Sequence, residues 1–154
     1  MDKKSFESEF LQAHNKYREM HGAPPLQLSR QLCQSAQEWA DQLAKLGTSQ
    51  HSAAAEGSIG ENIYERTGKE PTADHTVDSW YSEIKKYNFG SPGYVPGTGH
   101  FTQVIWKESK EVGVGVATDG KGRHYVVGQY NPGGNIDDPE SYKQNVLPAG
   151  SAAK

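Results

Sequence analysis

The chain has 154 residues, of which 34% are hydrophobic and 23% are charged, and its formal net charge is −3. This length suits one domain with a real buried core. Lysine and arginine are scattered without a basic stripe, so we expect no nucleic-acid partner. Cys33 is the single cysteine, so an intramolecular disulfide is excluded and a reducing compartment is favoured.

The first ten residues, MDKKSFESEF, carry charges and lack the apolar stretch of a secretory leader. Asp2 stands where N-myristoylation needs glycine. The longest uncharged run, residues 87–106, is interrupted by prolines and glycines, which argues against a membrane span. We expect a cytoplasmic protein or one held peripherally on endomembranes. An extracellular protein whose leader has been removed is the alternative.

Apolar residues at helical spacing predict three helices in the first part of the chain. They cover residues 5–20, 29–46 and 73–86. A polar segment, residues 48–62, separates the second helix from the third, and residues 62–65 (NIYE) are expected to form a short strand. A loop rich in glycine, proline and aromatic residues follows at 87–97.

The last third is rich in valine and aromatic residues, which predicts strands. They cover residues 101–106, 112–117 and 123–130. The segment TDGKG, residues 118–122, is typical of a hairpin turn between the last two. Helices followed by antiparallel strands predict a layered α+β domain and not a parallel βαβ sheet. We expect one domain over residues 1–147 and a flexible tail over residues 148–154.

Two of the six histidines differ from the rest in their setting. His51 and His100 each lie in a polar loop beside small residues, where sites are often built. The other four are expected to be packing or solvated residues: His14, His21, His75 and His124. Glu61 lies in the motif GEN, and Glu83 lies on the third predicted helix beside large aromatic rings, where a carboxylate needs a partner.

Four motifs together resemble one known family. They are HSAAAEGSIGENIY (51–64), SWYSEIKKYNF (79–89), GHFTQVIW (99–106) and QYNPGGN (129–135). Their order and spacing resemble the CAP superfamily, also called the SCP domain, over about residues 5–147. The segments GTGHFT and QNVLP are most similar to its Golgi-associated plant pathogenesis-related subgroup.

The resemblance implies a three-layer α-β-α sandwich with a mainly antiparallel central sheet. It also implies a cleft lined by two histidines and two acidic residues, here His51, Glu61, Glu83 and His100. On this interpretation His51 and His100 hold zinc or another divalent metal with modest affinity. Glu61 and Glu83 then accept hydrogen bonds from the two rings and orient them.

The family resemblance favours a non-enzymatic binding module over an enzyme. Anionic lipid or a sterol-like molecule is the expected ligand class, and protein partners or a homodimer are further expectations. Tyr87, Phe89 and Tyr94 in the 87–97 loop suit an apolar ligand or a bilayer surface, although they could instead pack the loop down. The alternative function is a metal-dependent hydrolase or protease that uses the same cleft.

Overall fold

The computed structural model describes residues 2–52 and 58–150. The helices are α1 (Lys3–Met20), α2 (Arg30–Leu46), α3 (Ala73–Tyr81), the 3-10 helix η2 (Ser82–Lys86), α4 (Gly99–Ile105) and α5 (Pro139–Asn145). The strands are β1 (Gln27–Leu28), β2 (Gly60–Thr67), β3 (Glu111–Thr118) and β4 (Arg123–Asn131).

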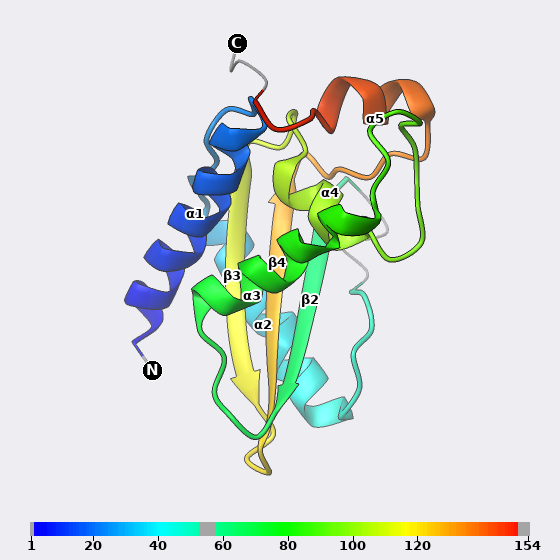
Figure 1. Ribbon diagram of the computed structural model, residues 1–154. Helices are drawn as coiled ribbons and strands as arrows, with labels where there is room; N and C mark the ends of the chain where they lie inside the picture. Colours follow the sequence, from blue (N-terminus) through cyan, green and yellow to red (C-terminus); the bar gives the residue numbers. More distant parts are fainter. Residues whose placement is uncertain (1, 53–57, 151–154) are drawn as a thin grey trace.

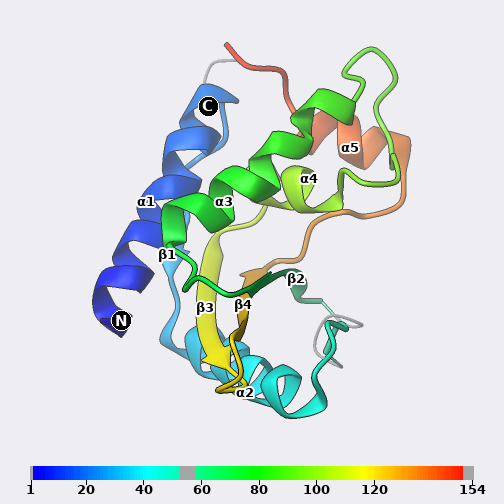
Figure 2. The ribbon, with the colours of Figure 1, turned by 60° about the horizontal axis from the view of Figure 1, so that its bottom comes forward.

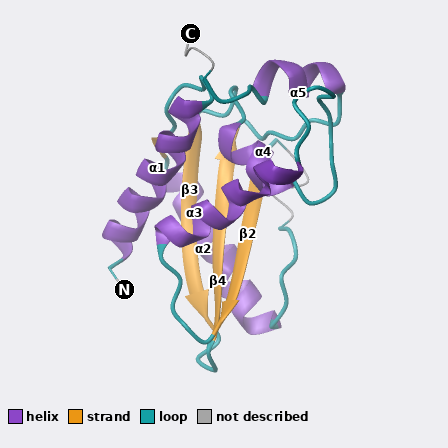
Figure 3. Cartoon of the chain, in the orientation of Figure 1, coloured by secondary structure: helices purple, strands orange, loops and turns teal. Residues whose placement is uncertain are grey.

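The elements form three layers, as Figures 1 and 2 show. The four strands make one sheet in the order β1-β3-β4-β2. Only the short β1 is parallel to its neighbour, and the other two pairings are antiparallel. Helix α2 covers one face of the sheet, while α1, α3 and α4 cover the other (Figure 3). The predicted three-layer sandwich with a mainly antiparallel sheet is therefore confirmed.

Strand β3 shows how its sequence builds two different faces. Its valines alternate with glycines, and the valines pack into the core beneath α1 and α3. A Cβ atom on Gly113 would lie 2.2 Å from the Cys33 nitrogen, and one on Gly115 would lie 2.3 Å from the Gln37 Cα. The glycines thus allow the backbone of α2 to approach the sheet closely.

The strand predicted at residues 101–106 is wrong, because residues 101–105 belong to helix α4 and Trp106 is its C-cap. The segment is rich in β-branched and aromatic residues, which favour strands by propensity. In the structure Phe101 to Ile105 are buried throughout the helix, so no polar face reveals a helical period in the sequence. His100 therefore lies in the first turn of a helix and not at the entrance of a strand.

The boundaries of the other predicted elements lie closer to those in the structure. The third predicted helix ends as an α-helix at Tyr81 and continues as η2, which carries Glu83. Strand β2 is longer than the predicted 62–65 segment and includes Glu61. Helix α5 was not predicted, although Asp138 as N-cap followed by Pro139 is a start signal.

The C-terminal segment continues from α5 toward the end of α1. The Gly150 N–H donates to the Met20 carbonyl. The rest of the predicted tail, residues 151–154, lies outside the described residues, as do residues 53–57 of the polar segment. No helix in the described part of the chain combines the length and apolar character needed to cross a membrane.

A buried arginine fixes the position of α4 relative to α1. Arg18 is fully buried, and its guanidinium donates to five backbone carbonyls. They belong to Pro24, Val104, Trp106, Lys107 and Ser109. Three of these carbonyls lie beyond the end of α4, so one side chain ties the exit of that helix to the first helix.

Candidate functional site

His51 and Glu61 form the first of two histidine–carboxylate pairs. His51 follows the end of α2, which stops at Gly47 in the left-handed conformation (φ 72°). Its Nδ1 lies 3.0 Å from Oε1 of Glu61 on β2. The His51 side chain is 60% exposed and the Glu61 side chain 0% exposed. A buried carboxylate thus holds an imidazole ring that is exposed to solvent.

The buried carboxylate of Glu61 receives three more hydrogen bonds. Ser52 donates its backbone N–H to Oε1 at 2.8 Å and its hydroxyl to Oε2 at 2.6 Å. The Gln129 amide donates to Oε2 at 2.8 Å. Burial by itself raises the pKa of Glu61, but these hydrogen bonds outweigh it and hold the pKa below its usual value. The hydrogen bond to Glu61 also raises the pKa of His51, against the opposing effect of burial.

His100 and Glu83 form the second pair. Nδ1 of His100 lies 2.7 Å from Oε2 of Glu83, and the Phe101 N–H donates to Oε1 at 3.0 Å. Helix α4 has no side-chain cap of its own, so Glu83 satisfies one of its free N–H groups from η2. The His100 ring also stacks on Trp80, with ring centroids 6.0 Å apart and planes inclined by 8°.

The two pairs share one geometry. In each, a single carboxylate accepts both the ring Nδ1–H of a histidine and the backbone N–H of the next residue, Ser52 or Phe101. A carboxylate that accepts at Nδ1 requires the proton on that nitrogen, so Nε2 of the neutral ring keeps a free lone pair. Each ring is therefore oriented with an acceptor nitrogen available for a ligand.

Two neighbouring residues of β2 contact the two pairs, one from each face of the strand. Glu61 shares the α2 face with Gln129. The next residue, Asn62, points to the other face and donates to the His100 carbonyl at 3.1 Å. Within residues 2–52 and 58–150, no group of three or more His, Cys, Asp or Glu side chains is arranged to hold a metal ion. The structure brings each histidine to its glutamate but does not gather all four side chains into one ligand cluster.

A hollow of about 610 Å³ lies beside the first pair. His51 and Glu61 contribute to its lining together with Gln103, Asn135 and Ile136. Neither Glu83 nor His100 lines it. The Asn135 amide donates to the Gly99 carbonyl at 2.8 Å, which connects the rim of the hollow to the first turn of α4. The hollow thus reaches the helix that carries His100 without including that ring.

The donor set fits an open metal site better than a closed one. Two imidazoles with free Nε2 atoms are good ligands for zinc, and a carboxylate orients each ring. A structural zinc site normally has four protein ligands, which the described residues do not supply. Water or an incoming ligand would have to complete the coordination.

The three aromatic residues predicted for a lipid surface have different environments. Tyr87 is 7% exposed and belongs to the core, and Phe89 packs against the same core. Tyr94 is 60% exposed. The first two rings pack the 87–97 loop onto the domain, so only Tyr94 presents a large ring to solvent.

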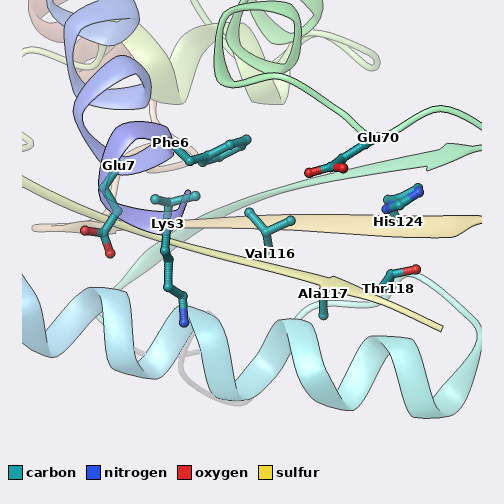
Figure 4. A pocket seen from close by; sticks show the side chains of 9 residues that line it. Lys3, Phe6, Glu7, Glu70, Val116, Ala117, Thr118 and His124 are labelled. Carbon is teal, nitrogen blue, oxygen red and sulfur yellow. The ribbon is translucent and has the colours of Figure 1, made fainter. Parts of the chain in front are cut away.

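A second, apolar hollow of about 300 Å³ lies between the start of α1 and the β3–β4 hairpin (Figure 4). Phe6, Val114 and Val116 form its apolar part, and Glu70 and His124 stand at its border. Since His124 pairs with Thr118 near the hairpin, whereas Glu61 pairs with Gln129, this hollow lies at the end of the sheet away from Glu61.

Sequence reasoning did not identify the residues that hold the two pairs in place. Ser52 and Gln129 contact Glu61, Trp80 stacks on the His100 ring, and Asn62 contacts the His100 carbonyl. All four are inside the quoted motifs: Ser52, Asn62 and Trp80 stand within three positions of His51, Glu61 or Glu83, and Gln129 begins the motif QYNPGGN. Their place in those motifs is the signal that could have pointed to them.

Residues 11–130 match the family described as "CAP: Cysteine-rich secretory protein family". The chain is 45% identical over 150 residues to human Golgi-associated plant pathogenesis-related protein 1, covering 94% of each chain. It is 34% identical over 138 residues to pathogenesis-related protein 1A of Nicotiana tabacum, covering 88% of this chain and 80% of that one.

Solved structures show the same fold. BmVAL-1 matches with a TM-score of 0.77 and 24% identity, covering 93% of this chain and 84% of that one. NaASP2, solved with Zn²⁺, matches with a TM-score of 0.72 and 21% identity, covering 98% of this chain and 88% of that one. At these identities the likeness supports the fold and not a shared ligand.

Proposed function

Because this chain belongs to the CAP, or cysteine-rich secretory protein, family, we propose that it is a non-enzymatic binding module. Its two histidine–glutamate pairs offer imidazole nitrogens to a divalent metal, and its surface associates with lipid and with protein partners. The observation that carries this proposal is the orientation of the two rings, because each Nδ1 is bound to a carboxylate and neither Nε2 has a hydrogen-bond partner among the described residues.

Zinc is the metal that we propose, with His51 and His100 as its protein ligands. Borderline-soft imidazole nitrogens suit zinc, and each ring is held with Nδ1 on a carboxylate. Glu61 and Glu83 act through the rings, since their oxygens already accept hydrogen bonds. Bound metal would supply an electrophilic centre for an anionic ligand. With two protein ligands, its affinity is expected to be modest.

The lipid part of the proposal rests on two features. The apolar hollow beside Phe6 can accept part of a hydrocarbon chain, and Tyr94 exposes an aromatic ring on the 87–97 loop. Attachment through such a surface is weak and reversible. We accordingly propose a peripheral protein of endomembranes. The name of the human Golgi-associated relative supports that location. We also propose that the protein forms a homodimer.

The geometry gives less support to a hydrolase. The Ser52 hydroxyl donates to Glu61 and not to a histidine, so it is not arranged as a nucleophile with an imidazole base. Glu61 holds a lowered pKa and accepts four hydrogen bonds, which makes it a weak general base. We therefore favour binding over turnover at this site.

Calorimetric titration with zinc chloride at pH 7 tests the metal proposal. Wild-type protein should release heat with a fitted affinity, and His51→Ala and His100→Ala should each weaken it by about tenfold or more. His75→Ala is the matched control because His75 is an exposed histidine outside the site. Equal heats from the wild type and both site variants would remove the metal from the proposal.

A further inference from the structure

A chain of buried hydrogen bonds runs from α1 through two strands to the carbonyl of His100. The His14 ring lies 2.8 Å from the Phe10 carbonyl through Nδ1 and 2.6 Å from the Tyr130 hydroxyl through Nε2. The Asn62 amide lies 3.3 Å from the same hydroxyl and 3.1 Å from the His100 carbonyl. His14, Asn62 and Tyr130 are each at most 1% exposed.

Only one direction of donation satisfies every member of this chain. The Phe10 carbonyl can only accept, so Nδ1 of His14 carries the proton and Nε2 accepts. The Tyr130 hydroxyl must then donate to His14, and its oxygen accepts from Asn62. The second amide hydrogen of Asn62 is left for the His100 carbonyl. Burial lowers the pKa of His14 to about 3, so the neutral ring that this pattern needs persists at neutral pH.

A second contact leads from His14 to His100 through aromatic rings. The His14 ring lies edge-on to Trp80 with centroids 6.3 Å apart, and Trp80 stacks on the His100 ring. His14 therefore reaches the backbone of His100 through Tyr130 and Asn62, and the ring of His100 through Trp80. Among the described residues no comparable chain leads to His51, whose side chain is 60% exposed.

We propose that Tyr130 and Asn62, anchored by His14, are positioning residues that set the direction of the His100 ring for its ligand. The inference rests on the proposed function of His100 as a metal ligand. A satisfied polar network in a core is rigid because each lost partner leaves a buried group unpaired. Removing one hydroxyl should therefore loosen the first turn of α4 and misdirect Nε2 of His100, while His51 keeps its orientation.

The test compares Tyr130→Phe with Tyr125→Phe. Both tyrosines are fully buried on β4, but the Tyr125 hydroxyl takes no part in the hydrogen bonds that join His14 to His100, so the control removes an equivalent atom from outside that chain. Zinc titration at a temperature where both variants are folded should show affinity about threefold to tenfold weaker for Tyr130→Phe. Tyr125→Phe should stay within about twofold of the wild type. Wild-type affinity in Tyr130→Phe would overturn the proposal.

Metal-free protein provides the second readout, from NMR of the histidine rings. Tyr130→Phe should shift or broaden the ring signals of His100 and leave those of His51 unchanged. Equal shifts at both rings would indicate general loosening and overturn the proposal, as would an unchanged His100. If wild-type protein binds no zinc, the proposed function fails while this readout still decides the positioning role. Asn62→Ser, which removes the amide donors, replaces Tyr130→Phe if that variant does not fold.

Discussion

Glu83 and His100, 17 positions apart in the sequence, are joined by a 2.7 Å hydrogen bond between Oε2 and Nδ1. The other oxygen of Glu83 accepts the N–H of Phe101, the next residue of the same helix. One carboxylate thus orients the ring and caps the helix that carries it. Because the two roles share one side chain, a change at Glu83 should affect both stability and ligand binding.

Glu83→Gln keeps the shape of the side chain but removes its negative charge and one accepting oxygen. The ring N–H and the Phe101 N–H bind different oxygens of Glu83, and the amide replaces one of these oxygens with an NH₂ donor, which removes the acceptor of one N–H group. We expect a loss of about 1–3 kcal/mol in the free energy of unfolding, measured by urea denaturation. Glu140→Gln, at an exposed position on α5, should change it by less than about 0.5 kcal/mol. Equal stability of both variants would show that Glu83 does not cap α4.

The pair of His51 and Glu61 should contribute most to stability in mild acid. A raised pKa of His51 means that its contribution is present below the usual value of 6.5 and is lost as pH rises through the folded pKa. A lowered pKa of Glu61 means that its contribution is present above the usual value of 4.5 and is lost as pH falls through the folded pKa. The two conditions overlap between these usual values.

Urea unfolding of the wild type and His51→Ala, in the presence of a chelator, checks this window. Their difference in unfolding free energy should be larger at about pH 5.5 than at about pH 9. NMR titration should place the pKa of His51 above its usual value in the wild type and lower it in Glu61→Gln. A difference in stability that stays flat over this range would contradict the ion pair.

Gly113→Ala should be among the most damaging single-methyl changes in the chain. Its Cβ would lie 2.2 Å from the Cys33 nitrogen, and backbone atoms of α2 cannot move without separating the helix from the sheet. We expect a loss of about 1–3 kcal/mol or more, seen as a lower melting temperature. Gly90→Ala, on an exposed loop, is the control and should melt close to the wild type.

Tyr94→Ser should weaken membrane association if the 87–97 loop contacts the bilayer. Flotation with vesicles that contain anionic lipid should recover less of this variant than of the wild type, because a half-exposed aromatic ring is lost. Leu46→Ser removes a comparably exposed apolar side chain at the end of α2 and should float like the wild type. Equal recovery of all three proteins would argue against this loop, and recovery insensitive to salt and lipid charge would argue against electrostatic recruitment.

Residue patterns were sufficient for much of the fold because the signals were local. The amphipathic spacing of α1 and α2 and the hairpin at 118–122 each depend on neighbouring residues, and the structure confirms these elements. The strand predicted at residues 101–106 was wrong because tertiary contacts, and not local preference, determine the structure of this segment. Helix α4 is surrounded by protein, and its N-terminus is capped by Glu83 from another element, so its local composition favoured the wrong structure.

For the candidate site, too, the sequence predicted some features and the tertiary structure determined the others. The motifs alone identified His51, Glu61, Glu83 and His100, and they suggested that each glutamate serves a histidine. Only the tertiary structure determined which carboxylate meets which ring and that Asn62, next to Glu61 on β2, contacts the backbone of His100. It also added the buried chain from His14 to His100. The physical reason is that the residue type alone fixes the chemistry of a side chain, whereas the groups that it contacts depend on how elements distant in the sequence pack together.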